Sequence, residues 1–220
     1  MKSKNTIEAE QTKDSCCLSC FKKIKEDVPR EILERKVFLC DDCISQVKTK
    51  LAITKMNGVF VLFLGEYDGI MKKWLMDFKE YGDIELSKCF LYLYLPLIHL
   101  LFPDYIFVPC PSSFSRNEKR GFVHLEEMLK AYSLPYVLAL DKISEEENKT
   151  LSASGRGNIA SSIRLNSNGE SLKNRKVVIF DDVMTSGNTF LSSAREVRKA
   201  NPKKIRGLIL MRTKRPDYSL

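Results

Sequence analysis

Two adjacent acids followed by small hydroxylated residues are the clearest chemical feature of this sequence. The apolar residues 176–180 predict a buried strand, and Asp181 and Asp182 follow it directly. Residues 188–200 then predict a helix, whose first N–H groups and dipole favour an anion. A glycine in the connecting turn lets the backbone approach a ligand. The predicted anion-binding loop comprises Val183, Met184, Thr185, Ser186, Gly187, Asn188 and Thr189.

The acid pair narrows the kind of anion. Carboxylates beside a bare phosphate would repel it, whereas they can accept hydrogen bonds from the hydroxyls of an attached sugar. The simpler interpretation is two solvated acids and a hydroxyl that caps the helix. The complete order of strand, acids, loop and helix favours a sugar phosphate.

Four of the seven cysteines form two pairs with a metal-binding spacing. Each pair is C-x2-C, and nineteen residues separate the pairs, as in two-knuckle zinc sites. Four thiolates satisfy tetrahedral Zn²⁺ and leave no position for substrate, so we expect a structural role. A redox pair is the alternative, and Cys16 competes with its neighbour as a ligand. The predicted ligands are Cys17, Cys20, Cys40 and Cys43.

The elements around these residues alternate between strand and helix. Buried strands are predicted at 58–64, 105–108, 136–139, 176–180 and 205–211, and helices at 67–81, 85–101, 119–132 and 188–200. Such alternation indicates an α/β fold, a parallel sheet with helices on both faces. We expect a zinc module at 1–50 and a second domain at 51–220, in which the polar residues 141–174 form a long mobile loop.

The acid-and-loop segment resembles the 5-phosphoribosyl 1-diphosphate (PRPP) motif of type I phosphoribosyltransferases, over nine consecutive positions. The resemblance implies that Asp181 and Asp182 are the catalytic acids that hold the ribose hydroxyls. It also implies that residues 183–189 cradle the 5′-phosphate. Mg²⁺ is expected with the pyrophosphate, held mostly by ligand oxygens and water.

Two further blocks resemble the ComF (ComFC) family. They are VPCP at residues 108–111 and KRGF at 119–122, and the family also begins with paired CxxC knuckles, so the resemblance covers about residues 16–213. The family usually has Asn-Gln where this chain has Val123 and His124. By position, the pyrophosphate would be held by Ser112, Ser113, Arg116, Lys119 and Arg120, and an ordinary solvated loop is the alternative. Lys79, in the segment FKEYG, could also reach the ligand.

The charge is concentrated at one end of the chain. Residues 171–220 hold 12 basic and 4 acidic side chains, a net charge of +8 that equals that of the whole chain. A localised excess indicates an anionic partner, or else serves solubility. The longest apolar run, residues 89–102, is shorter than the roughly 20 residues of a spanning helix. The first 14 residues are polar, so we expect a cytoplasmic protein without a membrane span.

The resemblance implies a PRPP-binding ComF protein that supports natural competence and the uptake and handling of single-stranded DNA. Its partners would be single-stranded DNA and a competence helicase or other uptake proteins. A metabolic phosphoribosyltransferase that releases pyrophosphate and a non-catalytic PRPP-binding scaffold remain alternatives.

Overall fold

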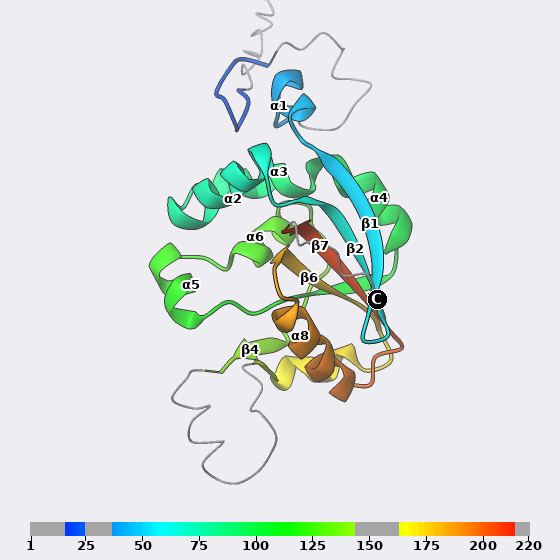
Figure 1. Cartoon of the computed structure of the whole chain (residues 1–220). Coiled ribbons are helices and arrows are strands. Elements are labelled where there is room, and N and C mark those ends of the chain that lie inside the picture. The colour runs from blue at the N-terminus through cyan, green and yellow to red at the C-terminus, as the bar shows by residue number, and fades with distance from the viewer. Residues whose placement is uncertain (1–15, 25–36, 144–162, 214–220) are drawn as a thin grey trace, which may run out of the picture.

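The computed structural model describes residues 16–24, 37–143 and 163–213, which build one five-stranded sheet with the order β1-β2-β7-β6-β3 (Figure 1). Four strands are parallel: β2 (Val59–Glu66), β7 (Lys204–Arg212), β6 (Lys176–Met184) and β3 (Tyr105–Pro109). Their central residues are apolar and buried, as parallel strands between two helical layers require. The predicted α/β fold is confirmed.

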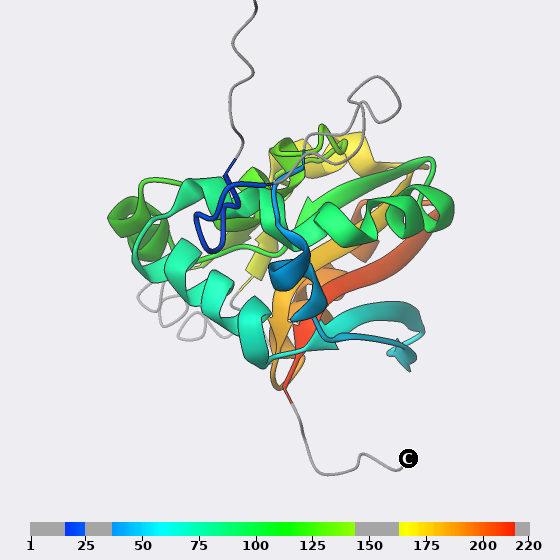
Figure 2. The ribbon, with the colours of Figure 1, turned by 90° about the horizontal axis from the view of Figure 1, so that it is seen from above.

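Helices cover both faces of the sheet (Figures 1 and 2). On one face lies α8 (Asn188–Lys199), so close that a Cβ on Gly207 of β7 would stand 2.6 Å from the Phe190 ring. On the other face, the Phe102 ring at the end of α4 (Leu95–Leu101) lies 6.3 Å from the Phe107 ring of β3. The helix α2 (Gly69–Glu80) buries Met71, Trp74, Leu75 and Phe78, as its amphipathic spacing predicts.

Several predicted elements differ from the structure. The strand β1 (Thr49–Met56) was not predicted, because it is an exposed edge strand with no clear apolar alternation; it pairs antiparallel with β2. The predicted helix 119–132 is two helices, α5 (Phe114–Arg120) and α6 (His124–Lys130). Gly121 separates them with a left-handed backbone at φ 82°. Residues 136–139 form only an isolated bridge, from Tyr136 to Phe107 of β3.

The apolar stretch predicted as one kinked helix is a series of four short ones. These are η2 (Ile84–Leu86), α3 (Ser87–Leu91), η3 (Tyr92–Tyr94) and α4. By length and composition alone, Ile84–Leu101 could cross a membrane. This differs from the prediction that the apolar run at residues 89–102 is too short to span one. Phe90, Leu91 and Ile98 of this stretch are buried in the core, so it serves as a covering layer of the sheet.

Part of the predicted loop 141–174 is ordered structure. Strands β4 (Leu140–Lys142) and β5 (Ile163–Leu165) form a small antiparallel sheet, and η4 (Ser167–Leu172) follows. The buried carboxylate of Glu196 on α8 accepts a hydrogen bond from the Leu165 N–H at 3.4 Å. Residues 144–162, the centre of the predicted mobile loop, lie outside the described residues.

The cysteine-containing segment packs onto the main body. Trp74 of α2 donates its indole N–H to the Ser19 hydroxyl at 2.8 Å, and the Phe38 ring lies 5.9 Å from the Tyr92 ring. Leu39 is fully buried. The short helix α1 (Asp41–Ser45) leads from this segment into β1. The division of the chain at residue 50 is a proposal. The described residues of the N-terminal part contact α2 and η3 of the main body.

Candidate functional site

The two adjacent acids lie inside β6, three and two residues before its last residue. They point to opposite faces of the sheet. The strand continues to Met184, whereas the apolar pattern predicts its end at Phe180. Because successive side chains of a strand alternate, Asp182 shares the face of Phe180, on the side of α2 and α6. Asp181 faces the side of α8. The pair therefore does not act as one cluster of equivalent carboxylates.

Asp182 is the centre of a buried polar network. Its Oδ2 accepts a hydrogen bond from His124 Nε2 at 2.5 Å and forms an ion pair with the Lys79 ammonium. Its Oδ1 accepts from the Val183 N–H at 2.6 Å. Only 5% of Asp182 and 5% of His124 is exposed, so protein groups rather than water satisfy this carboxylate.

The hydrogen bonds around His124 define its tautomer. Arg120 Nη1 lies 3.1 Å from His124 Nδ1, and a guanidinium can only donate, so Nδ1 is the acceptor. The ring proton is then on Nε2 and is donated to Asp182. Burial lowers the pKa of His124, in agreement with a neutral ring. Burial opposes the ionisation of Asp182, but His124 and Lys79 outweigh it and hold the pKa of Asp182 below its ordinary value.

Asp181 has the opposite electrostatic character. Burial, and then the charge of Asp182, raise the pKa of Asp181 to about 8. Its Oδ1 accepts from the Asp182 N–H at 3.1 Å. On the same side the buried thiol of Cys110 lies 3.4 Å from the Ser193 hydroxyl of α8. Asp181 is half-buried and is therefore the more exposed acid of the pair.

The predicted anion-binding loop lies between β6 and α8. Thr185, Ser186, Asn188 and Thr189 are exposed, and α8 has no acid in its first turn. Gly187 is the N-cap, with a left-handed backbone at φ 78°. A Cβ there would stand 2.9 Å from Cε of Met56, the last residue of β1. Glycine is therefore required by the backbone and by packing, besides the approach to a ligand that the sequence suggests.

The residues predicted to hold pyrophosphate fall into two groups. Lys79, Ser112 and Arg120 join the Asp182 network: Arg120 Nε donates to the Lys79 carbonyl at 3.0 Å, and the Ser112 hydroxyl lies 3.2 Å from His124 Nδ1. By contrast, Ser113 is the N-cap of α5 and Arg116 is exposed on that helix. The structure thus brings the first group to Asp182 and places the second on α5.

A pocket of about 340 Å³ lies elsewhere, at the opposite end of β3. Its lining includes His99, Phe102, Phe107 and Tyr132 and contains neither acid of the pair. The acid pair lies instead near the carboxyl ends of the parallel strands, the edge at which open α/β sheets commonly bind ligands.

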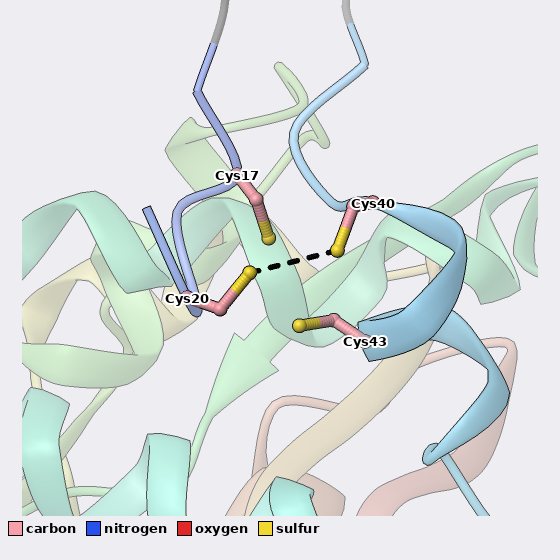
Figure 3. Close-up of side chains that lie close together, drawn as sticks. All are labelled: Cys17, Cys20, Cys40 and Cys43. Carbon is pink, nitrogen blue, oxygen red and sulfur yellow. Dashed lines mark hydrogen bonds between the residues drawn. The ribbon is translucent and has the colours of Figure 1, made fainter. Parts of the chain in front are cut away.

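The four predicted metal ligands converge (Figure 3). The Sγ atoms of Cys17, Cys20, Cys40 and Cys43 all lie within 4.8 Å of one another, and those of Cys20 and Cys40 are 3.6 Å apart. Four sulfurs at about 2.3 Å from one ion would be separated by about 3.8 Å in a tetrahedron, so the cluster fits Zn²⁺. Cys17 and Cys43 are buried, whereas Cys16 is exposed and outside the cluster.

The comparisons with known proteins agree with this architecture. The model of the phosphoribosyl transferase domain matches residues 118–218. Competence protein ComFC of Bacillus subtilis is 23% identical over 196 residues, which are 83% of this chain and 77% of that protein. ComFC of Streptococcus pneumoniae is 26% identical over 204 residues, 90% of this chain and 89% of that protein. Together these matches support a ComFC-family, phosphoribosyltransferase-like protein.

Solved structures similar to this chain include hypoxanthine-guanine phosphoribosyltransferase of Bacillus anthracis. It is 14% identical with a TM-score of 0.36, over 79% of this chain and 80% of that one. Hypoxanthine phosphoribosyltransferase of Trypanosoma cruzi is 11% identical with a TM-score of 0.37, over 59% and 65%.

One residue of the Asp182 network was not among the predicted site residues. His124 is interpreted from sequence as a partly buried helix residue, and it does begin α6, but it also contacts Asp182. The available signal was its place four residues after Arg120, one helical turn along the chain. Arg156, which belongs to the predicted mobile loop, lies outside the described residues.

Proposed function

We propose that this protein binds PRPP, or a closely related phosphoribosyl ligand, at the carboxyl ends of β6 and β3. The observation that carries the proposal is the junction of β6 and α8. It presents a half-buried acid, an exposed hydroxylated loop and the start of a twelve-residue helix within one short segment. The loop and the helix start suit a 5′-phosphate, and Asp181 suits a ribose hydroxyl.

The cations beside Asp182 fit the pyrophosphate of such a ligand. Lys79 has a side chain that is one-quarter exposed, and Arg116 is exposed on the neighbouring α5. Both side chains could contact a polyanion while His124 and the Val183 N–H continue to hold Asp182. Mg²⁺ would be held mostly by pyrophosphate oxygens and water, with Asp181 as the more exposed acid of the pair.

Titration calorimetry with PRPP and Mg²⁺ tests this proposal. Saturable binding by the wild type is expected, and Asp181→Asn and Thr189→Val should each weaken it roughly 10-fold or more, since each removes a hydrogen bond to a charged or polyhydroxyl ligand. Ser171→Ala, which removes a hydroxyl from η4 away from the site, is the matched control. Absence of binding by the folded wild type would reject the proposal.

The same assay can separate binding from turnover. Release of pyrophosphate in the presence of a nitrogenous acceptor would indicate a metabolic phosphoribosyltransferase. Binding without release would indicate a ligand-dependent scaffold.

We further propose that the protein acts in natural competence by handling single-stranded DNA. The relatives that carry the name competence protein support this role. An exposed aromatic residue with two cations supports direct contact. Phe60 of β2 is 45% exposed, with Lys55 Nζ at 5.6 Å and Arg206 Cζ at 5.1 Å from the ring centroid.

This surface combines what single-strand binding requires, an aromatic platform beside positive charge. Lys55, Phe60 and Arg206 come from three neighbouring strands in register. Phe60 precedes Arg206 by more than a hundred residues. The sequence alone therefore did not reveal an aromatic side chain beside the basic C-terminal segment. Lys204, two residues before Arg206, lies on the same face and is also exposed.

Fluorescence anisotropy with a labelled oligothymidine tests direct contact. Phe60→Ala and Arg206→Gln should each weaken binding, the first by roughly 5–100-fold from lost stacking. Phe21→Ala makes the same change at an exposed phenylalanine beside the cysteine cluster and should leave binding unchanged. Loss at Phe21 alone would move the contact to that segment. Equal binding by all variants would favour a protein partner, such as a competence helicase.

We also propose that the cysteine cluster holds structural Zn²⁺ and that the protein is cytoplasmic. The donor set of four closely spaced thiols supports zinc. Free thiols, rather than disulfides, suit a reducing compartment.

A further inference from the structure

The structure assigns to His124 the role of positioning residue for Asp182: its Nε2–H orients the carboxylate within the phosphoribosyl site. This inference rests on the proposed function, because it concerns the same site. His124 does not touch the ligand in this scheme. It acts through Asp182, whose Oδ2 it contacts at 2.5 Å.

The geometry makes His124 a one-directional donor. Arg120 on α5 donates to Nδ1 at 3.1 Å, and the Ser112 hydroxyl lies 3.2 Å from the same atom. Because Nδ1 is an acceptor, the neutral ring carries its proton on Nε2, and this N–H donates a hydrogen bond to Asp182. A chain of hydrogen bonds therefore runs from α5, through the first residue of α6, to β6.

The two partners of Asp182 Oδ2, His124 and Lys79, differ in conformational freedom. His124 is 5% exposed and is fixed at both ring nitrogens. The Lys79 side chain is one-quarter exposed and bears its charge at the end of a flexible stem. An anionic ligand can attract Lys79 away from Asp182, whereas the imidazole stays in place. His124 thus keeps the carboxylate oriented when the ion pair is exchanged for the ligand.

Two substitutions separate the two hydrogen bonds of the ring. In His124→Gln, the terminal amide nitrogen reaches the position of Nε2 and can still donate to Asp182. In His124→Asn, the shorter amide reaches only the position of Nδ1, so the Arg120 contact can persist while the Asp182 contact is lost. Both variants are polar and similar in size, and thermal denaturation of each shows that it is folded.

The experiment measures the affinity for PRPP with Mg²⁺ and the tautomer of His124. We expect His124→Gln to bind within about threefold of the wild type and His124→Asn to bind at least tenfold more weakly, the loss of one charge-assisted hydrogen bond. In ¹⁵N-detected NMR the wild type, which has only two histidines, should show His124 protonated at Nε2. His99→Gln assigns the second imidazole.

The outcomes distinguish this inference from the proposed function. If the wild type binds PRPP and both variants bind equally well, or if Nδ1 carries the proton, His124 does not position Asp182 and the inference is wrong. If the folded wild type binds no PRPP, the proposed function fails, and with it any role in orienting an acid for that ligand. In that case the NMR tautomer still decides whether His124 donates to Asp182.

Discussion

Asp181 and Asp182 are neighbours in the chain, yet they extend to opposite faces of β6. Asp182 contacts Lys79 and His124 on the side of α2 and α6, whereas Asp181 lies on the side of α8. The first is held ionised by its partners, and the second has a pKa raised to about 8. Two residues of one type therefore have different surroundings, one inside a buried network and one more exposed.

Replacement of Asp182 should destabilise the fold. Asp182→Asn removes the charge that pairs with Lys79 and weakens the bond from His124, at a cost of about 1.5–3 kcal/mol for a hydrogen bond to a charged group. The midpoint of thermal unfolding should fall by about 2–4 °C for each kcal/mol.

Asp104→Asn is the matched control for this prediction. It makes the same change in an acid that pairs with Lys176 at 3.1 Å, but whose side chain is 74% exposed. Exposed pairs contribute about 0–1 kcal/mol. Equal shifts of the midpoint in the two variants would show that the Asp182 network adds no stability.

The raised pKa of Asp181 predicts a dependence of stability on pH. The unfolded chain releases this proton near pH 4, whereas the folded chain keeps it to about pH 8. Between these values the unfolded state binds fewer protons, so the contribution of Asp181 to stability falls as the pH rises. Asp181→Asn cannot ionise, and its stability relative to the wild type should increase from pH 5 to pH 8.

Urea denaturation at several pH values checks this expectation. Asp104→Asn, again, is the control, and its difference from the wild type should stay nearly constant over the same range. Parallel stability curves for Asp181→Asn and the wild type would show that Asp181 ionises normally in the folded protein.

Zinc content should depend on four particular cysteines. The wild type is expected to hold one equivalent of zinc by elemental analysis, and Cys17→Ser should lose it, because a serine hydroxyl is a poor ligand for this ion. A chelator should lower the unfolding midpoint, since the cluster packs against α2 through Ser19 and Trp74. Cys16→Ser should keep both zinc and stability. Zinc loss from Cys16→Ser instead would exchange the roles of the two neighbours.

Gly187 should tolerate alanine less well than Gly58 does. Both have left-handed backbones, at φ 78° and φ 80°, so alanine costs about 1–2 kcal/mol at either position. Only at Gly187 would the new Cβ meet another side chain, Cε of Met56 at 2.9 Å. Gly187→Ala should therefore be less stable than Gly58→Ala and should also bind PRPP more weakly.

A second substitution tests the origin of that difference. Met56→Ala removes the atom that the new Cβ would meet, so it should recover part of the stability lost in Gly187→Ala. If the two glycine variants unfold at the same midpoint, the contact with β1 has no influence on the loop.

Local patterns in the sequence predicted much of this protein. The apolar residues of β6 and β7, the amphipathic spacing of α2 and the paired cysteines each depend on residues close together in the chain. The segment from Asp181 to Thr189 likewise presented strand, acids, loop and helix in one stretch. Such features are set by the 3.6 and 2.0 residue periods and by ligand spacing, which a single sequence displays.

Other features could be decided only by the tertiary structure. The edge strand β1 has no buried face to produce an alternating pattern, and Gly121 interrupts a segment that has helical composition throughout. The different surroundings of Asp181 and Asp182 depend on how far β6 extends and on which helix covers each face.

The contacts that carry the proposals also join distant parts of the chain. His124 meets Asp182 across 58 residues, and Phe60 meets Arg206 because β2 and β7 are neighbours in the sheet. Strand order and helix placement follow from the packing of the whole core, and no local period records them. The sequence by itself therefore determined the type of most elements and the clustering of four cysteines, and the fold decided which distant side chains contact one another.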